Sequence, residues 1–144
     1  MTQSRTYGPQ YSDVQVGSEL PLLKLRPVDR TTLALYAGAS GDHNQIHIDI
    51  DFARKARVPD VFAHGMLSAA YLGRLLTSWV AQTQIRSFSM RFVGITQIGH
   101  IPHLSGRITE KFEADGEKRV RLQIQCANQY GEPKIVGEAV VALA

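Results

Sequence analysis

One apolar segment constrains the fold more than any other part of the chain. Residues 65–80 read G-M-L-S-A-A-Y-L-G-R-L-L-T-S-W-V, with Arg74 as the one charged side chain. Helices that are apolar nearly all round are buried on most of their faces. The run is also shorter than the roughly 18 apolar residues that indicate a membrane span. We therefore predict a long helix that the rest of the chain encloses.

After Gln84 the pattern changes to the period of strands. Four segments rich in Val, Ile, Phe and Thr follow, and several of them alternate apolar with polar residues, as V-R-L-Q-I-Q does from Val120. Residues 114–117 (A-D-G-E) and 129–132 (Q-Y-G-E) have the chemistry of tight turns between antiparallel strands. We predict strands over residues 87–98, 104–113, 118–128 and 134–143, with residues 18–25 as a further candidate.

Two short helices are expected before the long one. The apolar spacing of residues 28–39 predicts an amphipathic helix with Asp29 as its N-cap, buried through a stripe of Leu33, Tyr36 and Ala37. Residues 51–56 predict a second helix, capped by Asp49 or Asp51. One long buried helix and about five antiparallel strands in 144 residues predict an α+β domain, and we expect residues 1–144 to form a single domain.

Charge and cysteine content indicate which kinds of partner and which cellular compartment to expect. The net charge is +3, but the basic residues are interleaved with acids and lack the spacing of known nucleic-acid motifs, so we expect no nucleic-acid partner. The densest basic groups, residues 54–57 and 118–121, are either solvated faces or a landing site for an anionic partner. The lone Cys126 lies in an apolar stretch and the first residues lack a signal-peptide core, so we expect a buried thiol and a cytoplasmic location away from membranes.

A carboxylate and an imidazole stand close together in the segment G-D-H-N-Q-I-H. Asp42 and His47 are five residues apart and would point in different directions on a helix or a strand. Gly41 and Asn44 are loop formers, so a bend can bring the two side chains together as an acid–base pair. The alternative is structural: Asp42 caps a turn and His47 is a packed side chain.

A second kind of chemical group precedes the long helix, at H-G-M. If the helix begins near Gly65, its first N–H groups lack intrahelical acceptors and lie at the positive end of the helix dipole. Glycine there lets a ligand approach the backbone closely. The segment therefore predicts a site for a carbonyl oxygen that gains negative charge, and the alternative is an ordinary helix start.

Together these motifs resemble a known family. G-D-H-N-Q-I-H, then A-H-G-M-L, then R-F-V-G-I-T-Q-I-G at residues 91–99 are similar to the MaoC-like, (R)-specific enoyl-CoA hydratases and to dehydratase subunits that act on 3-hydroxyacyl carriers. The resemblance implies a hot-dog fold, in which a curved antiparallel β-sheet wraps a long central α-helix, assembled as a homodimer or a dimer of dimers. It departs from the family at Gln45 and near Gln97, where relatives carry proline.

The resemblance also assigns roles. It implies that Asp42 and His47 are the catalytic pair, that the Gly65 amide is the oxyanion donor, and that the supporting residues are Ser40, Asn44 and His64. The implied activity is that of a hydro-lyase, which hydrates trans-2-enoyl-CoA to (R)-3-hydroxyacyl-CoA or catalyses the reverse dehydration. The histidine spacing predicts no metal, and no cofactor is expected. The alternatives are a dehydratase subunit for acyl-carrier-protein thioesters, a thioesterase, and a non-catalytic acyl-thioester binder.

Overall fold

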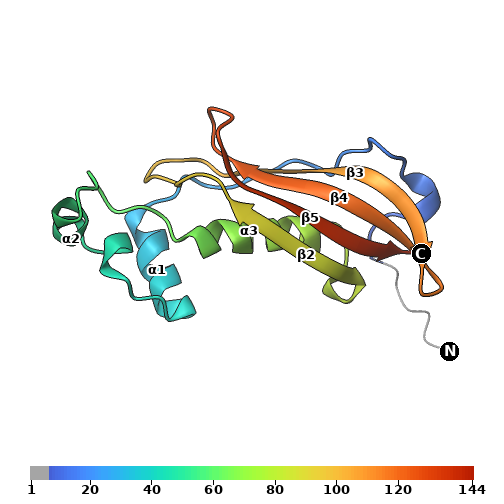
Figure 1. The fold of residues 1–144 in the computed structure, drawn as a ribbon, viewed down its shortest axis with the longest axis horizontal. Coiled ribbons are helices and arrows are strands. Elements are labelled where there is room, and N and C mark those ends of the chain that lie inside the picture. The colour runs from blue at the N-terminus through green and yellow to red at the C-terminus, as the bar shows by residue number, and fades with distance from the viewer. Residues whose placement is uncertain (1–6) are drawn as a thin grey trace.

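The computed structural model describes residues 7–144, and its helices and strands follow the predicted order (Figure 1). The helices are α1 (Arg30–Ser40), α2 (Ile50–Lys55) and α3 (Gly65–Trp79). The strands are β1 (Leu23–Lys24), β2 (Ile85–Phe92), β3 (His103–Ala114), β4 (Glu117–Ala127) and β5 (Pro133–Leu143). None of the helices in this described part is both long and apolar enough to cross a membrane.

The strands form one antiparallel, five-stranded sheet in the order β1-β3-β4-β5-β2. A two-residue turn joins β3 to β4, and Asp115 and Gly116 have φ of 51° and 73°. Asp-Gly suits that left-handed pair of positions, and such turns match the twist of the flanking strands. Strand β2 lies at the edge and pairs with β5, although β3 and β4 separate them in sequence. The predicted α+β class is confirmed.

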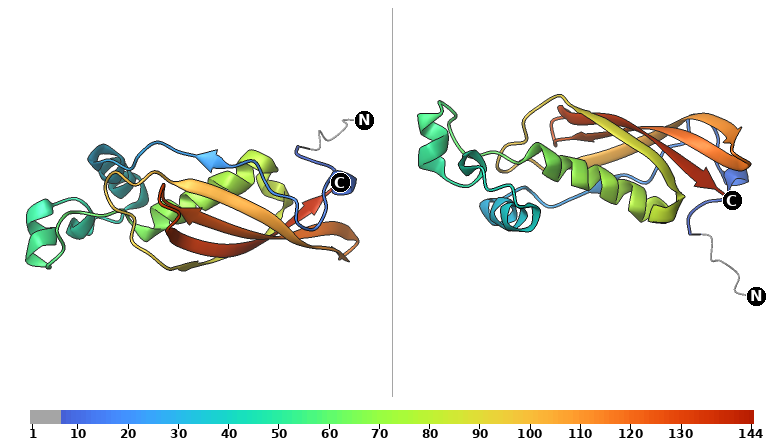
Figure 2. Two further views of the ribbon diagram at one scale, coloured as in Figure 1. Left: turned by 90° about the horizontal axis from the view of Figure 1, so that it is seen from above. Right: turned by 60° about the horizontal axis from the view of Figure 1, so that its bottom comes forward.

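The sheet curves over α3, which lies against its inner face (Figures 1 and 2). The main core joins leucines of α3 to apolar side chains of three strands: Leu72, Leu75 and Leu76 with Ile108, Leu122, Ile124, Ile135 and Val141. Fully burying one such side chain contributes about 1.5–3 kcal/mol. The long helix is confirmed, but its burial is incomplete in one chain, since Met66 is 58% exposed and Ala70 and Arg74 also face solvent.

Helices α1 and α2 lie beyond the N-terminal end of α3, away from most of the sheet (Figure 1). The predicted N-caps are present: the Asp29 side chain accepts from the Thr32 N–H, and that of Asp49 from the N–H groups that open α2. A smaller core holds this region together: Val28, Leu33, Ala53, Val61, Ala63 and Leu67. Arg30 also donates to both carboxylate oxygens of Asp60, at 2.9 and 2.6 Å, which ties the start of α1 to the segment before α3.

The chain after β2 differs from its prediction. A strand was expected over residues 87–98, but β2 ends at Phe92 and an irregular segment follows. Part of this segment pairs with the residues that lead into α3: the Thr96 carbonyl accepts from the Ala63 N–H at 2.9 Å, and Gln97 bridges to Phe62. The segment leaves the sheet edge because its backbone pairs with these residues, and it thereby supports the start of α3.

Cys126 lies where the sequence predicts it, inside the main core. Its side chain is 2% exposed and forms no disulfide. Burial raises the pKa of the thiol to about 11, so the sulfur stays protonated at neutral pH.

Candidate active site

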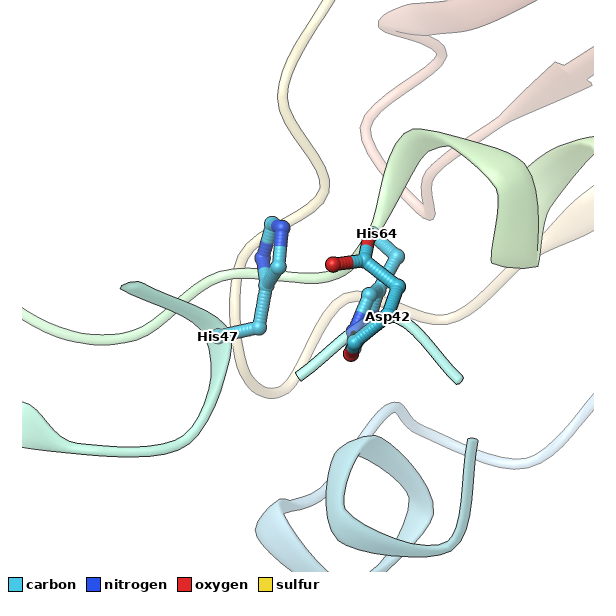
Figure 3. A group of neighbouring side chains, drawn as sticks. All are labelled: Asp42, His47 and His64. Atoms are coloured by element: carbon cyan, nitrogen blue, oxygen red, sulfur yellow. Dashed lines mark hydrogen bonds between the residues drawn. The ribbon is translucent and has the colours of Figure 1, made fainter. Parts of the chain in front are cut away.

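The loop between α1 and α2 is folded by its own short polar side chains. Gly41 ends α1 in the left-handed region, with φ of 77°. The Asp42 N–H then donates to the Ser40 hydroxyl at 3.2 Å, and the Asn44 N–H donates to an Asp42 carboxylate oxygen at 3.2 Å. The Asn44 side chain accepts from the Ile46 N–H at 3.1 Å and caps a short 3-10 turn. These bonds turn the chain so that Asp42 and His47 face one another, as the loop-forming residues around them allow (Figure 3).

His47 is held by a backbone carbonyl outside the loop. Its Nδ1 lies 2.7 Å from the Phe62 carbonyl oxygen, and the Phe62 ring packs edge-on against the imidazole at 5.1 Å. A carbonyl oxygen can only accept, so in the neutral ring the proton is on Nδ1 and Nε2 is an acceptor. His47 is therefore prepared to act as a base through Nε2.

His64 occupies the N-cap of α3 and is 1% exposed. Its Nε2 lies 3.1 Å from the Asp42 backbone carbonyl, and its ring stacks on that of His47 with centroids 4.0 Å apart (Figure 3). The Tyr36 ring meets it edge-on at 4.8 Å. Burial lowers the pKa of His64, with a smaller contribution from His47 in the same direction. The imidazole is therefore neutral at neutral pH.

Gly65 is the first residue of α3, so its N–H has no intrahelical acceptor. The Phe92 ring covers its Cα closely: a Cβ at position 65 would lie 2.9 Å from two ring carbons. Phe92 itself is 54% exposed at the end of β2. The helix start therefore combines a backbone donor without an intrahelical acceptor with an aromatic ring that a side chain at position 65 would have to displace.

Asp42, His47 and His64 also form a set of possible metal ligands. One donor atom from each lies within 4.8 Å of the others. The imidazole planes, however, are 28° from parallel and stacked, which points their in-plane lone pairs side by side rather than toward one ion. The arrangement suits proton transfer between a carboxylate, a water and an imidazole better than metal chelation.

The structural alternatives for Asp42 and His47, a turn cap and a packed side chain, are partly correct. One Asp42 oxygen does close a turn, and His47 is packed on one side. The Asp42 carboxylate and the His47 ring nevertheless face each other. His43, in the same loop, is exposed. Sequence reasoning missed the Phe62 carbonyl and the Phe92 ring, because neither the polarity nor the spacing of these residues distinguishes them from core aromatics.

The two basic groups of the sequence differ in the structure. Arg119 forms ion pairs with Asp115 and Glu117, and Arg121 with two further glutamates. By contrast, the exposed basic residues at the end of α2 make no salt bridge within residues 7–144: Arg54, Lys55 and Arg57. Three cations without an ion pair in the described chain thus follow the site loop closely in sequence.

Comparisons with known sequences point in one direction. A family model described as MaoC like domain matches residues 13–128. The fatty acid synthase subunit beta of Saccharomyces cerevisiae is 31% identical over 118 residues, which cover 74% of this chain and 6% of that protein. The (R)-specific enoyl-CoA hydratase of Rhodospirillum rubrum is 32% identical over 66 residues, covering 46% of this chain and 44% of that protein. The chain thus spans a small part of the fungal subunit.

Solved structures agree on the fold. R-hydratase PhaJ1 from Pseudomonas aeruginosa superposes with a TM-score of 0.83 at 24% identity, covering 96% of this chain and 87% of that one. The (R)-hydratase from A. caviae involved in PHA biosynthesis gives a TM-score of 0.76 at 24% identity, covering 91% and 98%. The predicted hot-dog fold is confirmed.

Proposed function

Because the chain belongs to the MaoC-like hydratase and dehydratase family, we propose that it is a hydro-lyase that hydrates trans-2-enoyl thioesters to (R)-3-hydroxyacyl thioesters or catalyses the reverse dehydration. One observation carries the proposal: the Asp42 carboxylate and the acceptor nitrogen of His47 face the same space beside the start of α3. Hydration of an activated double bond needs a base for water, an acid for C2 and a donor for the thioester oxygen.

In the proposed reaction Asp42 and His47 hold one water molecule between them. His47 Nε2 takes a proton from the water as its oxygen bonds to C3, and the electrons of the double bond move toward the thioester oxygen. The Asp42 carboxylate takes this proton from the His47 imidazolium and delivers it to C2 as the electrons return from the thioester oxygen, so both residues end in their starting protonation states. One water is consumed, one C–O bond and one C–H bond form, and acid–base help of this kind contributes about 10²–10⁴ in rate.

The start of α3 is the proposed oxyanion site. The Gly65 N–H meets the thioester oxygen as it gains charge, and the dipole of a 15-residue helix supports it. One such donor contributes about 2.7–4 kcal/mol of transition-state stabilisation. Because the Phe92 ring lies over Gly65, the same aromatic side chain shields this bond from water.

A crotonyl-CoA assay tests the activity, since the enoyl absorbance falls as water adds. We expect Asp42→Asn and His47→Gln to lower turnover by about 10²–10⁴-fold, with His43→Asn, an exposed neighbour in the same loop, as the matched control. Release of free thiol without loss of the enoyl band would indicate a thioesterase instead. Turnover that the Asp42 and His47 variants leave unchanged would remove the pair from the reaction, and absence of turnover in the wild type would favour a non-catalytic binder.

Carrier-protein thioesters are the second candidate substrates. One observation favours them: the match to the fungal synthase subunit covers 74% of this chain and the match to the hydratase 46%. The α2 cations, which make no salt bridge within residues 7–144, suit an acidic carrier protein as well as the phosphates of coenzyme A. The test is to measure kcat/KM for CoA and carrier-protein thioesters in the wild type and in a variant with Arg54, Lys55 and Arg57 changed to Gln. A carrier-protein substrate predicts a loss confined to that thioester and relieved by salt.

A homodimer is part of the proposal. The free edge of β2 and the segment after it expose four large apolar side chains, Phe88, Phe92, Val93 and Ile95. Such an edge favours pairing with a second copy. Light scattering should give twice the chain mass, and Phe88→Asp should lower it while Leu35→Asp, an exposed leucine on α1, does not. A cytoplasmic location and a single domain over residues 1–144 stay predictions.

A further inference from the structure

The proposed proton transfers leave one buried polar side chain of the site without a function. His64 is 1% exposed and has no catalytic step to perform. Its Nδ1 has no hydrogen-bond partner within residues 7–144, so burying this side chain carries the cost of one unsatisfied polar atom. An apolar side chain would fill the same place without that cost. The position of the ring therefore calls for another explanation.

The contacts of the site loop supply one. Within the described chain, two hydrogen bonds connect the segment from Asp42 to His47 with the segment that leads into α3. One runs from His47 to the Phe62 carbonyl, and the other from His64 to the Asp42 carbonyl. The remaining bonds of the loop join it to itself or to its flanking helices. The His47 ring thus holds His47 itself to the segment before α3, and the His64 ring holds Asp42 to the same segment.

The two carbonyls also fix the two rings in opposite tautomers. The Phe62 oxygen requires a proton on Nδ1 of His47, and the Asp42 oxygen requires one on Nε2 of His64. The rings stack at 4.0 Å, so rotation of either imidazole disturbs the other. His64 therefore holds the Asp42 backbone in place through its hydrogen bond and holds the plane of the His47 ring through the stack.

Resting on the proposed function, we propose that His64 is the positioning residue of this site: a neutral imidazole that anchors Asp42 and supports the ring of His47, so that both meet the same water molecule. In this proposal it acts through Asp42 and His47 and not on the reacting atoms. The titratable groups that face it are Asp42, His47 and Tyr36. When His47 accepts a proton, a neutral neighbour avoids like-charge repulsion across the stack, and the burial of His64 maintains that neutrality.

Two variants separate the hydrogen bond from His64 to Asp42 from the stacking of His64 on His47. His64→Phe keeps an aromatic ring but loses the donor to Asp42, whereas His64→Gln keeps a donor but loses the ring. With crotonyl-CoA we expect His64→Phe to lower kcat about 10²-fold with KM changed less than about threefold, because misplacing a catalytic group by about 1 Å costs that much. We expect His64→Gln to recover about tenfold of the loss. His43→Asn is again the matched control, and thermal unfolding identifies variants that fail to fold.

Nitrogen-15 NMR of the histidine rings gives a readout that does not depend on turnover. In the wild type we expect His64 as the neutral Nε2–H tautomer at pH 7 and His47 as the neutral Nδ1–H tautomer. We expect the His47 tautomer to be kept in a folded His64→Phe variant, which retains the stacked ring, and to be mixed in a folded His64→Gln variant, which loses it. Values of kcat within threefold of wild type in both variants, a charged His64 at pH 7, or an unchanged His47 tautomer in His64→Gln would each overturn the proposal. A wild type without hydratase activity refutes the proposed function, while the NMR result still decides whether His64 positions the pair.

Discussion

Replacing Gly65 with alanine separates the two functions of the helix start, stability and transition-state binding. The new Cβ would lie 2.9 Å from two carbons of the Phe92 ring, so the ring must shift. Phe92 is 54% exposed, so the ring can yield, and alanine favours a helix over glycine by about 0.5–1 kcal/mol. We therefore expect the free energy of unfolding to change by less than about 1 kcal/mol.

Activity should respond far more strongly. We expect the added methyl group to hinder the approach of the thioester to the Gly65 amide, and losing one oxyanion donor costs about 2.7–4 kcal/mol, or about 10²–10³ in kcat. Urea unfolding and crotonyl-CoA kinetics of Gly65→Ala measure the two effects separately. The double variant with Phe92→Ala removes the steric contact and should regain little activity, because the Cβ itself blocks the approach. Activity within threefold of wild type in Gly65→Ala would refute the assignment of this amide.

Three further predictions concern stability and reactivity. Gln45→Pro should raise the free energy of unfolding by about 0.4–1 kcal/mol in urea titrations, because the preceding residue already has ψ of 120° and the first position of the 3-10 turn tolerates proline. Hydrogen bonds from Arg86 and Arg119 lower the pKa of Glu117 from 4.5 to about 2, so its contribution is present above pH 4.5 and is lost as the pH falls toward 2. Glu117→Gln should accordingly lower Tm at pH 7 but not near pH 2, and an equal difference at both values would contradict this. Cys126 should react with a thiol reagent only as the chain unfolds, and rapid labelling of the folded protein would contradict its burial.

Local chemistry explains why much of the fold could be predicted from the sequence. Asp29 and Asp49 mark the starts of two helices because a short acidic side chain accepts from the first free N–H groups. Asp115 and Gly116 mark a hairpin because they tolerate positive φ. The pairing of β2 with β5 had no such signal, since nothing local distinguishes one apolar strand partner from another. The exposed face of α3 was also missed, because its apolar sequence does not tell whether this chain or a second one covers it.

The site divides in the same way. Asp42 and His47 could be identified because two reactive side chains flank loop-forming residues, and the structure brings them together. The Phe62 carbonyl could not be predicted, since a backbone oxygen leaves no trace in residue type. The stack of His64 on His47 depends on the segment before α3 returning to the loop, which is a tertiary contact.

The configuration of the product tests the central claim most directly. Purified protein is incubated with crotonyl-CoA, and the 3-hydroxybutyryl product is analysed by chiral chromatography, with Asp42→Asn treated identically. The proposed function predicts the (R) product from the wild type, and the proposed catalytic pair predicts a rate lower by about 10²-fold or more from the variant. An (S) product, no product, or equal rates from the two proteins would contradict the assignment of Asp42 and His47 as the hydrating pair.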